Sequence, residues 1–192
     1  MEIYLIRHTA PPIEKGICYG QTDISVAECF HNEARKLKLR LPEISDAVYS
    51  SPLSRCLKMA KQLNPGKEIL IDDRLLEMNF GDWEMKNWDE IDQQELNKWM
   101  QDFVNEKVPG GENFVTLNNR VNHFIDELLQ SSFERVAIFT HAGVIRCFVA
   151  RVLEISLNNV FRIAVDYSSV AKIHLNRDKN LNRMENLNTA IY

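Results

Sequence analysis

The sequence predicts an α/β fold in which helices cover both faces of a mostly parallel central sheet, a three-layer α/β/α sandwich. Apolar runs at 3–6 and 136–139 are short and rich in β-formers, which is typical of buried strands in such a sheet. Strand-like runs alternate along the chain with helix-like segments, the pattern of an α/β fold. The chain has 192 residues, 45% of them hydrophobic and 26% charged, which is typical of one globular domain. We therefore expect a single domain over residues 1–192.

The first elements are a strand over residues 2–7 and an amphipathic helix over residues 26–41. Between them lies a loop rich in turn formers, from Ala10 to Gln21. Pro42 is expected to end the helix, because proline cannot continue the hydrogen-bond ladder.

A second strand is expected at 47–50, followed directly by a helix. Ser51 can cap this helix with Pro52 at the first helical position, a favourable arrangement for a helix start. The helix should end before the turn formers at 64–66, and a short strand at 69–71 follows.

The middle of the chain is predicted to be helical. Residues 89–103 form one helix, and the turn at 108–112 leads into a second, stronger one. Apolar residues recur in the second helix every three or four positions, which places them on one face. They are Phe114, Leu117, Val121, Phe124, Ile125, Leu128 and Leu129.

The last predicted elements are a strand at 135–140, a helix at about 143–154 and a strand at 170–175. The asparagine-rich tail from Asn176 has no clear pattern. The right-handed rule for crossover connections limits the topologies that these elements can adopt.

Two histidines follow predicted strands, and this placement indicates where the chemistry occurs. His8 and its neighbour Arg7 leave the first strand, and His141 leaves the strand at 135–140 just before a helix. Ligands bind open α/β sheets at the carboxyl ends of the strands. Arg55 lies at the start of the helix after the second strand, and arginine binds phosphate through two parallel hydrogen bonds. The pattern predicts an anion site with a histidine nucleophile inside it.

Four segments together resemble the motifs of the histidine phosphatase (phosphoglycerate mutase-like) superfamily. They occur in the order of that family, and the turn at 109–112 also matches one of its recurring features. Four ordered motifs are far more specific than a single Arg-His pair. The segments are Leu5-Ile6-Arg7-His8-Thr9, Ser50-Ser51-Pro52-Leu53-Ser54-Arg55, Leu76-Glu77-Met78-Asn79-Phe80-Gly81-Asp82-Trp83-Glu84 and Thr140-His141-Ala142-Gly143-Val144-Ile145-Arg146.

The resemblance implies a phosphoglycerate mutase-like fold and a role for each matching residue. His8 would attack phosphorus and become a phosphohistidine. Arg7, Arg55 and His141 would hold the phosphate oxygens and stabilise the charge of the transition state. Glu77 would protonate the leaving alcohol and then assist the attacking water. Because the arginines supply the positive charge, we expect neither a metal nor a cofactor.

Simpler explanations exist for several of these residues. Arg7 and Arg55 could be ordinary surface arginines, and Asp82 and Glu84 are rival acids in the same loop as Glu77. The remaining histidines are expected to be ordinary surface or helix residues, and the tryptophans to belong to the core or to the wall of the pocket. These are His31, His123, His174, Trp83, Trp88 and Trp99.

The stretch Gly16-Ile17-Cys18-Tyr19-Gly20-Gln21-Thr22-Asp23 resembles the α-ribazole phosphatases of cobalamin synthesis. By this resemblance Gly20 and Gln21 are candidate phosphate-binding residues, as is Ala142 at the start of the later helix, where free N–H groups favour an anion. Thr9 and Met85 depart from the family, which usually has glycine at both positions. A larger side chain at position 9 would narrow the pocket.

Several functions remain open beside α-ribazole 5′-phosphate hydrolysis. A phosphoglycerate mutase is less favoured, because the acid-bearing loop has the phosphatase-like form around Glu77. Fructose-2,6-bisphosphatase-like, broad sugar phosphatase and phosphohistidine-protein phosphatase activities are alternatives. A phospholigand-binding module without turnover is the non-enzymatic one.

We expect a small-molecule phosphate monoester as the partner, a monomer or homodimer, and a cytoplasmic location. The net charge of -4 gives no reason to expect binding to nucleic acid or an anionic membrane. No signal peptide or apolar stretch of membrane-spanning length is apparent. The segment at about 78–115 is expected to form a lid-like insertion that selects the substrate.

Overall fold

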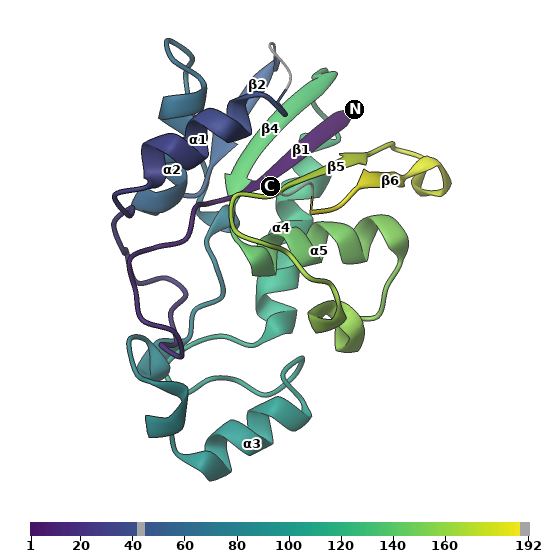
Figure 1. The fold of residues 1–192 in the computed structure, drawn as a ribbon. Helices are drawn as coiled ribbons and strands as arrows, with labels where there is room; N and C mark the ends of the chain where they lie inside the picture. The colour runs from purple at the N-terminus through teal and green to yellow at the C-terminus, as the bar shows by residue number, and fades with distance from the viewer. Residues whose placement is uncertain (42–44, 189–192) are drawn as a thin grey trace.

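The computed structural model describes residues 1–41 and 45–188 and contains a six-stranded sheet (Figure 1). The strand order is β3-β2-β4-β1-β5-β6. β1 to β4 run parallel to one another, and β5 pairs antiparallel with β1. The strands are β1 (Glu2–Arg7), β2 (Ala47–Ser50), β3 (Leu70–Ile71), β4 (Arg135–Thr140), β5 (Val170–His174) and β6 (Arg183–Asn186).

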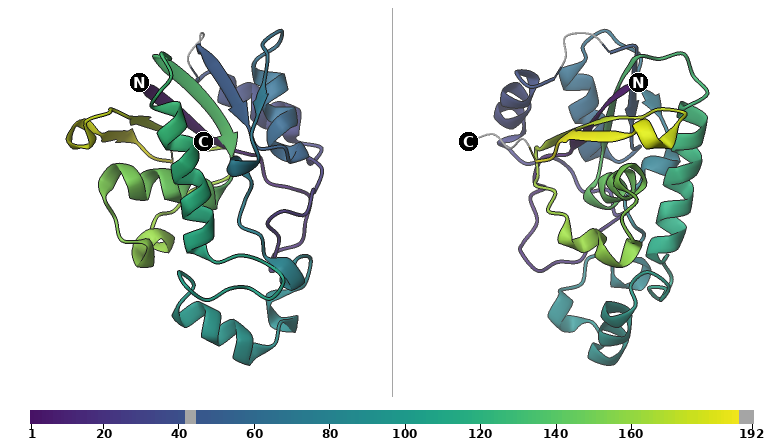
Figure 2. Two further views of the ribbon diagram at one scale, coloured as in Figure 1. Left: turned by 180° about the vertical axis from the view of Figure 1, so that it is seen from behind. Right: turned by 90° about the vertical axis from the view of Figure 1, so that its right-hand side faces the viewer.

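Helices cover both faces of the sheet, so the predicted three-layer α/β/α sandwich with a mostly parallel sheet is confirmed (Figure 2). Successive residues of a strand point to opposite faces. In β1, Ile3 and Leu5 therefore join the core formed with α4 (Phe114–Leu128) and α5 (Ala142–Leu153). Ile6 joins the second core, formed with α1 (Phe30–Lys38) and α2 (Ser54–Leu63).

The helix predicted over 26–41 is shorter than expected, because α1 begins only at Phe30. The segment before it lies against α2 instead, where Asp23 accepts hydrogen bonds from Ser54 and Ser25 accepts one from Lys58. Pro42, expected to end the helix, lies outside the described residues.

The predicted start of the next helix was wrong. α2 begins at Ser54, and Ser51 does not cap it with Pro52 at the first helical position. The Ser51 hydroxyl lies 2.8 Å from Nε2 of His141, and Asp23 serves as the cap from a distant loop, accepting from the Ser54 N–H at 2.7 Å. The residue types around Ser51 are typical of a helix cap, but the Ser51 hydroxyl is bonded to His141 instead of the helix start.

In Figure 1, the segment between Glu77 and α4 lies at the bottom of the molecule, beyond the carboxyl ends of β1 and β4. It contains two 3-10 turns (Gly81–Trp83 and Trp88–Glu90) and α3 (Gln93–Gln101), a shorter helix than the one predicted over 89–103. Asp92 starts α3 by accepting from the N–H groups of its first turn. The lid role of this segment stays a prediction.

The tail from Asn176 has more structure than its sequence indicates. β6 pairs antiparallel with β5 and forms the edge of the sheet. Three of its four residues are exposed, so no apolar alternation marks it in the sequence. In the described part of the chain, no helix has the length and apolar character needed to cross a membrane.

Candidate active site

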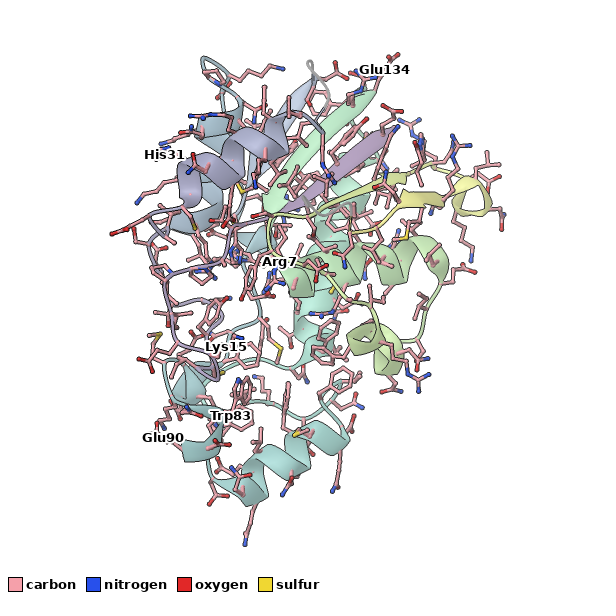
Figure 3. The ribbon with its side chains drawn as sticks, in the orientation of Figure 1. Arg7, Lys15, His31, Trp83, Glu90 and Glu134 are labelled. Carbon is pink, nitrogen blue, oxygen red and sulfur yellow. The ribbon has the colours of Figure 1, made fainter. Side chains whose placement is uncertain are left out.

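The register of the sheet brings the two predicted histidines together. Arg7 pairs with Thr140 across the parallel strands β1 and β4, so His8 and His141 each follow the last residue of a neighbouring strand. Their ring centroids are 5.1 Å apart, with the rings edge to face. Figure 3 shows Arg7 near the middle of the molecule, at the end of β1 that faces the Trp83-bearing segment. The strand ends therefore form the centre of the site, as predicted.

His8 is held in one tautomer by its two partners. Its Nδ1 lies 2.7 Å from the carbonyl oxygen of Thr9, which can only accept, so Nδ1 carries the proton. Its Nε2 accepts a hydrogen bond from Nε of Arg55 at 3.3 Å, so Nε2 is unprotonated and carries a lone pair. Burial, assisted by the charge of Arg55, lowers the pKa of His8 well below its usual value. His8 is therefore neutral near pH 7, with its proton on Nδ1 and its lone pair on Nε2.

Arg55 is fully buried, and backbone carbonyls fix its guanidinium. It donates to the carbonyl oxygens of Thr22 at 2.9 Å and Gly20 at 2.5 Å. The guanidinium also lies 5.5 Å from the ring centre of Tyr19. Because no carboxylate within ion-pair distance neutralises Arg55 in the described part of the chain, its charge is available to an anion beside His8.

Arg7 stacks on an aromatic ring beside His8. Its guanidinium carbon lies 3.7 Å from the ring centre of Tyr167, and Nη1 donates to the carbonyl of Val165. Its buried Nε–H finds no acceptor among the described residues. A phosphate oxygen would satisfy this donor, which agrees with the role predicted for Arg7.

His141 lies beside His8 but is fully buried, and its Nε2 is bonded to the Ser51 hydroxyl. It is not one of the residues that line the cleft. Burial, followed by the proximity of His8, lowers its pKa well below the usual value. Direct contact between His141 and phosphate therefore stays a prediction.

The carboxylate of Glu77 lies at the start of α5. Its carboxylate accepts from the N–H of Gly143 at 3.1 Å and from the N–H of Met78 at 2.9 Å. A Cβ on Gly143 would come within 2.2 Å of the carboxylate, so glycine is required for this approach. Glu77 lines the cleft with His8, where an acid could reach a leaving group, whereas the rival Asp82 does not line it.

The other rival acid, Glu84, organises two loops. Its carboxylate accepts from the N–H groups of Gly20, Gln21, Thr22 and Phe80 and from the Thr22 hydroxyl, at 2.6–3.1 Å. Burial alone would raise the pKa of Glu84, but these hydrogen bonds outweigh it and lower the pKa. Glu84 thereby joins the 16–23 loop to the loop that bears Glu77.

The geometry does not support the binding roles expected for Gly20 and Gln21. The Gly20 N–H donates to Glu84, and the Gln21 amide donates to the backbone carbonyl of Glu77 at 2.9 Å. Neither residue lines the cleft, while Ala142, the third binding candidate, does. A Cβ on Gly20 would lie 1.9 Å from the Met78 carbonyl, so this glycine permits two loops to pack together. Both residues hold the loop that in turn holds Arg55.

A cleft of about 220 Å³ is lined by Arg7, His8, Arg55, Glu77 and Ala142 of the predicted site. It is also lined by further side chains, and among these only Trp88 was expected as a candidate for the wall of the pocket. Tyr19 and Tyr167 are hydrogen-bonded to each other through their hydroxyls, and burial raises the pKa of Tyr19, which stays a neutral phenol. The other additional lining residues are Ile17, Phe80, Trp88 and Arg146. Of these, Arg146 is the last residue of the motif at 140–146. It lies one helical turn after Gly143, and this spacing predicts that both residues are on the same face of the helix.

Comparison with known proteins agrees with this arrangement. The family described as the histidine phosphatase superfamily (branch 1) matches residues 3–188. The chain belongs to this superfamily. The resemblance inferred from the four motifs is thus confirmed, and the protein is a phosphatase of the histidine phosphatase type.

Named relatives differ in substrate. The chain is 30% identical over 185 residues to a phosphoserine phosphatase-like protein of Hydrogenobacter thermophilus, covering 92% of this chain and 91% of that one. It is 26% identical over 186 residues to the adenosylcobalamin/α-ribazole phosphatase of Escherichia coli, with 92% and 91% covered. The crystal structure of the α-ribazole phosphatase from Shigella flexneri superimposes with a TM-score of 0.90 at 25% identity, covering 98% of this chain and 96% of that one.

Proposed function

We propose that the protein hydrolyses phosphate monoesters without a metal, by transferring the phosphoryl group to Nε2 of His8 and then to water. The observation that supports this most strongly is the tautomer of His8. Its Nδ1–H is bound to Thr9, so the lone pair of Nε2 is available beside Arg55. A neutral imidazole beside two guanidinium groups is suited to attack an anionic phosphorus centre.

In the first step, Nε2 of His8 forms a bond to phosphorus while the bond from phosphorus to the leaving oxygen breaks. Arg7 and Arg55 stabilise the charge on the phosphoryl oxygens, and Glu77 delivers a proton to the leaving alcohol. In the second step, Glu77 takes a proton from water as the water oxygen attacks phosphorus. The phosphorus–nitrogen bond breaks, and inorganic phosphate leaves with His8 restored.

α-Ribazole 5′-phosphate is one candidate substrate. The loop at 16–23 resembles the α-ribazole phosphatases, and two of the relatives act on this compound by name. Phe80 and Trp88 on the cleft wall provide flat apolar surfaces against which an aromatic base could pack.

Phosphoserine is a second candidate. A phosphoserine phosphatase-like protein is among the relatives, and the cleft contains a third arginine, Arg146, besides the two that flank His8.

The experiment is phosphate release from α-ribazole 5′-phosphate, phosphoserine, 3-phosphoglycerate, fructose 2,6-bisphosphate and p-nitrophenyl phosphate, each with and without EDTA. We expect release from at least p-nitrophenyl phosphate and one natural ester, with rates unchanged by EDTA. Strong inhibition by EDTA would contradict the metal-free mechanism. No release from any ester would favour a phospholigand-binding module instead.

A further inference from the structure

Arg146 is a cation that the phosphate site does not require. It lines the cleft together with Arg7 and Arg55, but it lies in α5, one helical turn beyond Gly143. Within the described ranges, no carboxylate lies within ion-pair distance of it. Burial is the main cause that lowers the pKa of Arg146, so the folded protein holds this charge where solvent stabilises it poorly.

The side chain of Arg146 is held in place by two contacts. Its Nε donates to the carbonyl oxygen of Ile163 at 3.1 Å, and its guanidinium carbon lies 5.1 Å from the ring centre of Phe161. The two terminal nitrogens, Nη1 and Nη2, have no acceptor among the described residues. An arginine fixed in this way presents a planar pair of donors, the geometry that matches the two oxygens of a carboxylate.

Arg146 lines the same cleft as His8 and Glu77. Ala142, at the start of α5, also lines it, and Arg146 follows four residues later, about 6 Å along the helix axis. Side chains on a helix tilt toward its N-terminus, so Arg146 extends back toward the cleft. Glu77, which would protonate the leaving group, is bound to the same first turn of α5 through Gly143.

We propose that Arg146 binds a carboxylate on the leaving group, so that the preferred substrate is a small phosphate monoester with a carboxylate near the ester oxygen. This inference rests on the proposed phosphatase function of the cleft. It favours phosphoserine-like esters over α-ribazole 5′-phosphate, whose leaving group carries no anion.

The test compares phosphoserine with phosphoethanolamine, which has the same primary ester and ammonium group but lacks the carboxylate. The wild-type protein should show a kcat/KM for phosphoserine about 10-fold or more above that for phosphoethanolamine. Arg146→Met keeps a long apolar stem against Phe161 and should abolish this preference. Its kcat/KM for phosphoethanolamine and p-nitrophenyl phosphate should fall much less than its kcat/KM for phosphoserine, because the substitution removes charge-assisted bonding to the carboxylate.

Arg151→Met is the matched control. Arg151 lies in the same helix but is paired with Asp126 outside the cleft, so the substitution should leave the preference intact. If Arg146→Met does not fold, Arg146→Lys takes its place. It keeps the charge without the planar pair of donors, and it should lower the preference.

Three results would overturn the inference. Equal kcat/KM for the two esters in the wild-type protein would show that no carboxylate is bound, while turnover of p-nitrophenyl phosphate would leave the proposed function standing. Equal losses on both esters in the variant would show that Arg146 acts through Glu77 instead. No turnover of any ester would overturn the proposed function, and the inference with it.

Discussion

Single hydrogen bonds determine what each side chain of the site can do. The carbonyl of Thr9 and Nε of Arg55 leave His8 with one possible tautomer, in which Nε2 has the lone pair that the proposed nucleophile needs. The N–H groups of Gly143 and Met78 orient the carboxylate of Glu77. The proposed nucleophile and the proposed acid therefore line the same cleft in fixed orientations.

Glu77→Gln tests the role of the acid at this scale. General acid catalysis is worth about 10²–10⁴-fold, and it matters most for a poor leaving group. We expect kcat for a primary alkyl phosphate to fall about 100-fold or more, and that for p-nitrophenyl phosphate to fall less than about 10-fold. The measurement is a comparison of kcat across esters with different leaving-group pKa values.

Asp82→Asn is the control for Glu77→Gln. Asp82 is a rival acid in the same loop but does not line the cleft. Its substitution should leave the leaving-group dependence unchanged. Equal losses on all esters in Glu77→Gln would assign the acid role to another group.

The sequence predicts that the two histidines at the strand ends lie together, but it does not predict which loop side chains surround them. His8 and His141 follow apolar runs that are recognisable as strands, and parallel strands necessarily bring their ends together. Tyr167 comes from a loop without a motif, and its contact with Arg7 depends on how β5 approaches β1. For Gln21, residue type indicated a phosphate donor, but the neighbouring Glu77 carbonyl takes its amide.

At the scale of elements, the cleft depends on two loops that have little regular structure. The 16–23 loop supplies the carbonyls that hold Arg55, and the 77–84 loop supplies Glu77. Glu84 accepts backbone N–H donors on both of its oxygens and so links the two loops. Five hydrogen bonds from the two loops converge on this half-buried carboxylate.

Glu84→Gln tests this link. A glutamine amide has one acceptor oxygen, so in either orientation its NH₂ group would face backbone N–H donors and leave them unsatisfied. Each unsatisfied buried donor costs about 1–3 kcal/mol. We expect kcat/KM to fall about 10–100-fold, with faster amide hydrogen exchange in residues 16–23 and an unchanged far-ultraviolet circular dichroism spectrum.

Glu95→Gln, an exposed position in α3, is the control for Glu84→Gln and should change neither activity nor exchange. Wild-type activity in Glu84→Gln together with unchanged exchange would show that the link is dispensable.

Elements with a strong apolar pattern were predicted well, and weakly patterned ones were not. α4 follows the predicted apolar face closely, because its buried residues recur at helical spacing. α1 is shorter than predicted at both ends, and the segment just before the predicted start is bonded to α2 through Asp23 and Ser25. β6 has a mostly polar sequence at the edge of the sheet, where pairing with β5 rather than burial determines its structure.

For the molecule as a whole, cations are concentrated in the cleft of a protein whose net charge is -4. Arg7, Arg55 and Arg146 line the cleft, with Glu77 as the acid among them. An anionic substrate is therefore attracted locally, although the protein as a whole carries negative charge.

Two buried neutral histidines should also make the stability of the whole molecule depend on pH. The pKa values of His8 and His141 are lowered in the folded state, so below about pH 6.5 the unfolded chain binds protons that the folded protein does not. The free energy of unfolding should then fall as the pH decreases from 6.5, by up to about 1.4 kcal/mol per pH unit for each histidine. Urea unfolding between pH 7 and 5.5 measures this slope.

Substitution of one histidine shows how much that residue contributes to the pH dependence of the free energy of unfolding. His8→Gln should reduce the pH dependence by about half. His31→Gln, at an exposed position in α1 far from Arg7 in Figure 3, is the control and should not reduce it as much. A free energy of unfolding that stays constant between pH 7 and 5.5 would contradict the neutral, buried state of the two rings.

The central claim is that the phosphoryl group is transferred to His8. The most direct test is to mix the protein with a substrate labelled in its phosphate, to quench the reaction rapidly without acid, and to look for label on the protein. We expect an alkali-stable, acid-labile phosphohistidine on the peptide that contains His8. The His8→Ala variant should show no label and a turnover reduced roughly 10³-fold or more. Its folding must be measured alongside, because His8 is only 3% exposed. Rapid turnover without any phosphoenzyme, or label on a different residue, would contradict the account.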